Sequence, residues 1–150
     1  PKYLLQQKMF GVFQHTVKRN TSILLHGLDD TFNTPVSRHT ENRIKDFSDF
    51  PNLEILIESE VSGLCLIHDV KRRHLHMFNH LEYDSDTLHN EYIRDLSTGQ
   101  DVNMPLNYYP DNDPNKDPIN SWRGNGHLLF SNWVNFLYQT TPFLLKDIGQ

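Results

Sequence analysis

Alternating apolar and polar positions predict a strand at Gly11–Val17 and a short extended segment at Pro35–His39. Three further apolar runs predict strands at Leu53–Ile57, Leu64–Ile67 and Leu75–Phe78, and the first of them is rich in β-branched residues. Only short connections separate these last three runs. Antiparallel hairpins are therefore favoured over helical crossovers.

Two stretches in the second half of the chain have helical periodicity. The first covers residues 87–99, and its spacing places Leu88, Tyr92 and Leu96 on the side that faces the core. The second covers residues 127–139 and carries aromatic side chains on one side, which is typical of a core or a subunit contact. The pattern therefore predicts strands first and two helices afterwards.

The remaining segments have weaker patterns. Residues 1–10 carry scattered leucines and lysines, typical of a frayed helix or an arm, and residues 21–33 are loop-like. Residues 41–47 are compatible with one or two helical turns. Residues 100–126 are rich in Pro, Asn and Asp, and this segment is too long for an idle loop, so we expect it to be ordered by packing or to form part of a site.

Composition narrows the classes of protein to consider. The 150 residues suit one domain, and a net charge of −5 without a Lys/Arg-dense face argues against nucleic-acid binding. The basic run Lys71–Arg73 is best explained as a hairpin tip. A single cysteine excludes an internal disulfide, and no apolar run approaches the ~20 residues of a membrane span. We therefore expect a cytoplasmic protein that binds neither nucleic acid nor membrane.

The first candidate for chemistry is the pair His80 and Glu82, at the end of the last predicted strand. Side chains two positions apart in an extended chain point to the same face. A carboxylate beside an imidazole fixes its tautomer and stabilises its protonated form, as acid–base catalysis requires. The alternative is a surface histidine next to a solvated glutamate.

A metal site is a second possibility, because His74, His76, His80 and Glu82 share one face of an extended chain. At about 3.3 Å per residue, however, His74 and His80 lie roughly 20 Å apart. His74 and His76 could share an ion, but no further ligand is evident. A His-rich metal-binding domain is the weaker alternative.

A third possibility uses Cys65 as a nucleophile with His80 as its base. Cys65 lies inside the apolar run Leu64–Ile67, which offers neither a cationic neighbour nor partial exposure. We therefore interpret Cys65 as a buried structural residue. If the chain belongs to a cysteine enzyme, the nucleophile lies elsewhere.

Blocks along almost the whole chain, in order and with matching spacing, resemble the homoserine O-acyltransferases of methionine biosynthesis. The blocks are Gly11–His15, Gly27–Phe32, Pro35–His39, Leu53–Leu56, His80–Asp84, Asn107–Pro110, Ser121–Arg123, Leu128–Trp133 and Tyr138–Pro142. The resemblance covers only the C-terminal half of such an enzyme. It implies that residues 1–150 are half of a single domain, and that the N-terminal half with the nucleophile is absent.

The resemblance implies an α/β fold similar to class I glutamine amidotransferases, a flavodoxin-like three-layer sandwich. The implied reaction moves an acyl group from acyl-CoA, through a cysteine thioester, to the hydroxyl of homoserine. Acyl-CoA is then a co-substrate and no cofactor is needed. General likeness favours succinyl-CoA over acetyl-CoA, and the full-length enzyme is expected to be a homodimer.

The resemblance also assigns roles to individual residues. His80 matches the family's base and Glu82 its carboxylate partner, while Lys8, Ser37 and Arg94 match substrate-contacting positions. The planar guanidinium of Arg94 suits a substrate carboxylate. Its alternative role is an ion pair with a glutamate three positions earlier on the helix.

Two departures affect the motif around the base. Leu81 replaces a small residue or proline, and Asn79 stands where the family has a glycine, which would restrict the backbone there. An alternative remains that the chain is a truncated, non-catalytic remnant or an interaction module. In either case we expect residues 1–150 to be inactive alone.

Overall fold

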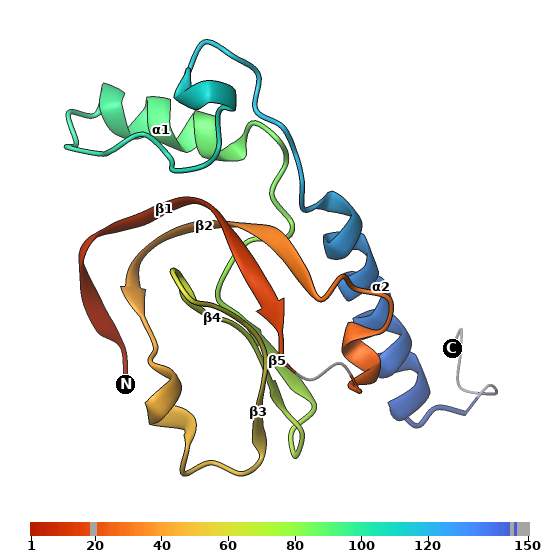
Figure 1. Cartoon of the computed structure of the whole chain (residues 1–150). Helices are drawn as coiled ribbons and strands as arrows, with labels where there is room; N and C mark the ends of the chain where they lie inside the picture. Colours follow the sequence, from red (N-terminus) through yellow and green to blue (C-terminus); the bar gives the residue numbers. More distant parts are fainter. Residues whose placement is uncertain (19–20, 145, 147–150) are drawn as a thin grey trace.

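A computed structural model of the chain describes residues 1–18, 21–144 and 146 (Figure 1). Five strands form one sheet in the order β2-β1-β3-β4-β5, and every strand pairing among them is antiparallel. The strands are β1 (Tyr3–Val17), β2 (Thr31–Glu41), β3 (Leu53–Ser59), β4 (Gly63–Asp69) and β5 (His74–Met77). The expected α/β class and the antiparallel hairpins at β3, β4 and β5 are confirmed.

The sheet curls, and its two helices lie on its outside (Figure 1). Helix α1 (Thr87–Ser97) lies across the β1–β2 end, and α2 (Arg123–Thr140) runs beside the sheet. The described residues also include the short 3₁₀ turns η1 (Ile23–Leu25), η2 (Ile44–Phe47) and η3 (Pro110–Asn112). The described strands do not form the parallel sheet of a flavodoxin-like sandwich, so these residues alone are not that three-layer fold.

The first strand corrects two expectations. Residues 3–10 are neither a frayed helix nor an arm, because they pair with β2, and the strand at Thr31–Glu41 includes positions that we expected to be a loop. The pairing is irregular between Leu4, opposite Thr40, and Met9, opposite Arg38. Such irregularities redirect side chains out of the regular ladder. Lys8 lies within this stretch.

The long segment after α1 is ordered by packing, as expected. Its Leu106 accepts a hydrogen bond from the amide of Val12 (2.8 Å) and donates one to the carbonyl of Phe10 (3.0 Å). A Cβ at Gly11 would lie 2.3 Å from the Leu106 carbonyl oxygen, so only glycine permits this approach. The segment is therefore fastened to the middle of β1.

The core is formed by strand side chains together with side chains from η1, the turn after β5, α1, the long segment and α2. Its buried members include Phe10, Val12, Leu24, Leu56, Ile57, Leu66, Leu81, Leu88, Tyr108, Trp122 and Leu129. Burial at about 25 cal/mol per Å² makes this cluster the main source of stability. The turn after β5 contributes Leu81 to this core, and α1 contributes Leu88.

Helix α1 begins and ends close to the expected positions, but its inner face differs from the expectation. Leu88 is buried and Tyr92 partly so, whereas Leu96 is 45% exposed and Asp95 is buried in its place. An ion pair with Lys8 draws Asp95 inward (2.9 Å). A polar contact with a distant strand has therefore overridden the apolar periodicity in the last turn.

Candidate active site

The pair at the end of β5 is formed as expected, although in a turn and not in an extended strand. His80 Nδ1 lies 2.8 Å from Glu82 Oε1, and both side chains reach the surface. The amide of His80 donates to the carbonyl of Pro35 on β2 (2.9 Å), which fixes the turn against the sheet. Since Nδ1 is engaged by Glu82, the imidazole offers Nε2 to a substrate.

The electrostatics of Glu82 fit a carboxylate that orients an imidazole. Burial acts to raise the pKa of Glu82, but hydrogen bonds from His80 and from the backbone outweigh it and lower the pKa below its ordinary value. Glu82 is therefore ionised at neutral pH. An ionised Glu82 is the form that stabilises a protonated imidazole.

The two departures in the motif are accommodated without strain. Asn79 is not among the non-glycine residues with a positive φ, so the described backbone there is open to any residue. Its buried side chain donates from Nδ2 to Nε2 of His15 (2.7 Å). Leu81 fills the core, and its carbonyl contacts α2 at Gly126, where a Cβ would lie only 2.7 Å away.

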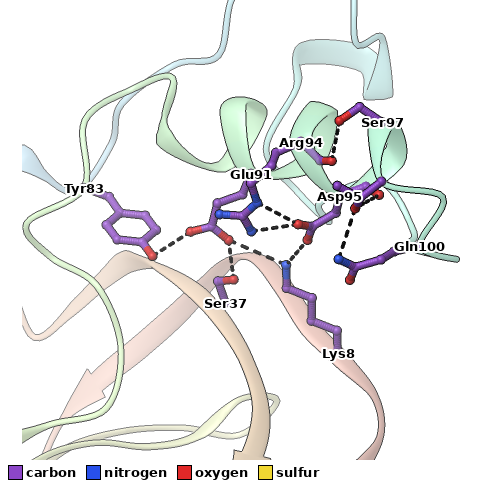
Figure 2. A network of polar contacts seen from close by, with 9 residues as sticks. Lys8, Ser37, Tyr83, Glu91, Arg94, Asp95, Ser97 and Gln100 are labelled. Atoms are coloured by element: carbon purple, nitrogen blue, oxygen red, sulfur yellow. Dashed lines mark hydrogen bonds and ion pairs between the residues drawn. The ribbon is translucent and has the colours of Figure 1, made fainter.

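The three expected substrate contacts converge on one acidic pair in α1 (Figure 2). Ser37 Oγ donates to Glu91 Oε2 (2.5 Å), and Lys8 Nζ lies 3.6 Å from the same oxygen. Lys8 also pairs with Asp95 Oδ2 at 2.9 Å. We call Lys8, Ser37, Glu91, Arg94 and Asp95 the acceptor cluster.

Arg94 pairs with a different carboxylate from the one that its spacing indicated. Its Nε and one terminal nitrogen donate to Asp95 Oδ1 at 2.9 and 2.7 Å, so the expected alternative, an ion pair with Glu91, is not the contact that forms. The hydrogen bond to Asp95 raises the pKa of Arg94. Lys8 and then Arg94 lower the pKa of Asp95. The side chain of Arg94 is 64% exposed, so its guanidinium remains accessible.

Tyr83 lies between His80 and the acceptor cluster. Its ring stacks on the imidazole of His80, with centroids 4.2 Å apart and an interplanar angle of 13°. Its hydroxyl donates to Glu91 Oε1 (2.7 Å). Burial and then the hydrogen bond to Glu91 raise the pKa of Tyr83, so the phenol stays protonated.

Sequence reasoning missed Tyr83, Glu91 and Asp95 as parts of the site. The signal was present for the two acids, since Glu91 and Asp95 are four positions apart and therefore share one face of a helix. Nothing in the sequence showed that this face would meet Lys8 and Ser37. That contact depends on the irregular stretch of β1.

A cavity of about 720 Å³ lies beside Lys8. It is lined by β1, β2 and the segment after α1, with Lys8, His39, Gln100 and Asn103 among its polar residues. His80 does not line it. The cavity therefore adjoins the acceptor cluster but is not where His80 would act.

The alternative chemistries lose support. Cys65 is fully buried, and burial raises the pKa of its thiol to about 12, so it is a neutral thiol and a poor nucleophile. His74 and His76 lie edge to face (centroids 6.2 Å), yet no group of three or more His, Cys, Asp or Glu residues in the described chain is placed to hold a metal ion. Across residues 1–18, 21–144 and 146, no helix combines the length and hydropathy that a membrane span requires.

Comparisons with known proteins give a matching family model and several similar proteins. A family model described as "HTS: Homoserine O-succinyltransferase" matches residues 1–143. Proteins named homoserine O-acetyltransferase from Rhizobium rhizogenes and Rhizobium leguminosarum bv. trifolii are 51% and 52% identical over 100% and 99% of this chain. The matches cover 49% and 48% of those proteins, so the chain spans about half the length of these relatives.

Solved structures extend the likeness to the fold alone. A GMP synthase-like protein from Thermoplasma acidophilum aligns with a TM-score of 0.57 at 9% identity, over 93% of this chain and 49% of that one. The crystal structure of SMU.1228c aligns with a TM-score of 0.60 at 12% identity, over 91% and 55% of the two chains. These neighbours support the expected glutamine amidotransferase-like fold class.

Proposed function

Because the chain belongs to the homoserine O-succinyltransferase family, we propose that it supplies the base and the acceptor-binding residues of a homoserine O-acyltransferase. One observation carries the proposal. Three side chains assigned to the substrate, Lys8, Ser37 and Arg94, gather on one acidic pair of α1, and Tyr83 connects this cluster to the His80–Glu82 pair.

The acceptor cluster matches the charges of a zwitterionic amino acid. Lys8 and Arg94 carry two positive charges, and Glu91 and Asp95 carry two negative charges, so the cluster is neutral as a whole. Homoserine presents an ammonium group to Glu91, and its carboxylate suits the exposed fork of Arg94. Ser37 holds the Glu91 carboxylate in place. A neutral cluster binds a zwitterion without leaving a buried charge unpaired.

His80 supplies the proton transfer. Its Nε2 removes the proton from the hydroxyl of homoserine while that oxygen attacks the thioester carbonyl of an acyl-cysteine. The carbon–sulfur bond then breaks, the acyl group stays on homoserine, and the departing thiolate recovers the proton from His80. Glu82 stabilises the imidazolium between these two steps. The acyl-cysteine itself forms when a cysteine outside residues 1–150 takes the acyl group from acyl-CoA and releases CoA.

The placement of these residues in the whole enzyme is part of the same proposal. Residues 1–150 are the C-terminal half of one domain, and the other half adds the nucleophile and the parallel sheet of the flavodoxin-like sandwich. The half-length match to relatives supports this arrangement. The homodimer and the cytoplasmic location remain predictions. The preference for succinyl-CoA also remains a prediction. The description of the family model names the succinyl group, whereas the names of the relatives favour acetyl-CoA.

A chimera tests the proposal directly. In it, residues 1–150 replace the matching half of the Rhizobium rhizogenes homoserine O-acetyltransferase; we call this protein the chimera. We expect it to form O-acylhomoserine from homoserine and acyl-CoA, measured by mass spectrometry with acetyl-CoA and succinyl-CoA in parallel. The parent Rhizobium rhizogenes protein is the control. A folded chimera without product would support the non-catalytic alternative.

A further inference from the structure

Tyr83 makes two contacts that serve different parts of the site. The face of its ring covers the imidazole of His80 (4.2 Å, 13°), and its hydroxyl reaches Glu91 Oε1 (2.7 Å) in the acceptor cluster. Figure 2 shows the hydroxyl of Tyr83 pointing at Glu91 from the side opposite Lys8. One rigid side chain therefore spans the distance between the base and the acidic residue that receives the ammonium group.

The backbone of Tyr83 is held in place independently of both contacts. The indole nitrogen of Trp122, which is fully buried at the start of α2, donates to the carbonyl of Tyr83 (2.8 Å). The amide of Tyr83 lies 3.5 Å from the carbonyl of His80 and closes the turn. With its backbone fixed, the ring has only two torsions left, and the stacking and the hydrogen bond determine both.

The two contacts of Tyr83 restrict two different motions: the tilt of the His80 imidazole and the rotation of the Glu91 carboxylate. Glu82 fixes Nδ1 of His80 but leaves the imidazole free to tilt about that hydrogen bond, and a flat aromatic neighbour removes the tilt. Ser37 binds only Oε2 of Glu91, and the Tyr83 hydroxyl binds Oε1, so the carboxylate cannot rotate. The orientation of the base is thereby tied to the orientation of the acceptor carboxylate.

We propose that Tyr83 is a positioning residue that holds the acceptor carboxylate Glu91 and the base His80 in register. The hydroxyl of homoserine then meets Nε2 when its ammonium group is bound at Glu91. This inference rests on the proposed function and adds to it a residue that does not itself exchange protons with the substrate. A misplacement of about 1 Å between reacting groups is enough to cost about 10²-fold in rate.

Two substitutions in the chimera separate the two contacts. Tyr83→Phe keeps the stacked ring but releases Glu91, so KM for homoserine should rise about tenfold with kcat within about twofold of the parent. Tyr83→Leu also removes the ring face, and kcat should fall at least about tenfold. Tyr3→Phe, which removes a hydrogen bond from a tyrosine hydroxyl to the carboxylate of Asp46 (3.2 Å), outside the candidate site, is the matched control and should change neither constant.

A double-mutant cycle tests the coupling itself. If the hydroxyl acts through Glu91, the loss in kcat/KM for Tyr83→Phe with Glu91→Gln should be smaller than the product of the two single losses. Independent effects that multiply, or a Tyr83→Phe variant with the parent's KM, would overturn the positioning role alone. An unsubstituted chimera that is folded but inactive would overturn the proposed function and this inference together. Tyr83→Phe carries the test even if Tyr83→Leu fails to fold.

Discussion

Lys8 Nζ lies 2.9 Å from Asp95 Oδ2, although 87 positions separate the two residues in the chain. The ammonium group also lies 3.9 Å from the centroid of the Phe10 ring. This contact ties the last turn of α1 to the irregular part of β1, and it brings Glu91 within reach of Ser37. The acceptor cluster therefore exists because a strand irregularity and an ion pair place one helix face over the sheet.

Glu91→Gln tests whether this carboxylate receives the ammonium group of homoserine. The amide keeps the shape but loses the charge, so KM for homoserine in the chimera should rise by about tenfold or more, the scale of a hydrogen bond to a charged group. Acylation of the enzyme by acyl-CoA should be unchanged. Glu60→Gln, at an exposed turn, is the control. A KM equal to the parent's would place the ammonium group elsewhere.

Arg94→Lys tests the carboxylate contact. An ammonium cannot reproduce the two-bond fork, so transfer from pre-formed acyl-enzyme to homoserine should weaken by about 1.5–3 kcal/mol. Because the side chain of Arg94 is 64% exposed, the stability of the protein should change by less than about 0.5 kcal/mol. Arg43→Lys, another exposed arginine paired with a carboxylate, is the control. Unchanged single-turnover transfer would mean that another residue, with Lys8 or Arg38 the next to test, binds the carboxylate of homoserine.

His15 predicts a pH dependence of stability. It is fully buried, with its Nδ1 bonded to the carbonyl of Phe13, and burial lowers its pKa to about 4. The folded state thus binds fewer protons than the unfolded state, whose histidine has its ordinary pKa. The contribution of neutral His15 to the free energy of unfolding is fully present above that ordinary pKa and is lost as pH falls towards 4.

Urea unfolding of the chimera measures this effect. Between about pH 7 and about pH 5 the free energy of unfolding should fall by roughly 2 kcal/mol because of His15. His15→Gln cannot titrate, so it should remove that part of the slope whatever its own stability, while His26→Gln, at an exposed position, should keep it. An identical slope in His15→Gln would show that His15 does not titrate in this range.

Residues 1–150 expressed alone should aggregate or lack a fixed core. Several large apolar side chains of α2 and the residues after it are exposed, including Val134 at 60% and Tyr138 at 63%. Surfaces of this kind, with the open edges of the curled sheet, require a partner layer. Differential scanning calorimetry combined with light scattering provides the check. A sharp, cooperative melt from a monomer would contradict the expectation.

Most helices and strands were predicted well because their hydropathy pattern and end residues follow rules that act within a short stretch of sequence. The three apolar runs became β3, β4 and β5, and Gly99, at a φ of +73°, follows the end of α1 as its position indicated. The strand at residues 3–10 was missed because its pairing with β2, and not its own periodicity, makes it a strand. The sequence pattern placed Leu96 in the core because no sequence rule shows that Asp95 would form a buried ion pair with Lys8.

For the candidate site as well, one part was predictable from the sequence and another part was not. The His80–Glu82 pair was predictable because both members lie in one turn, and two positions apart they reach each other. The acceptor residues came from the family resemblance, and the residue to which each of them binds came only from the structure. Tyr83 was missed because its contacts with His80 and Glu91 form only when the chain folds.

The most direct measurement is kcat/KM for homoserine in the chimera with His80→Ala. The account predicts a fall of at least ~10², the lower range for a positioned general base, and a smaller but clear fall for Glu82→Gln. His127→Ala, an exposed histidine on α2, should match the unsubstituted chimera. A folded His80→Ala variant with a kcat/KM close to the parent's would contradict the account, because the base would then have to lie outside this turn.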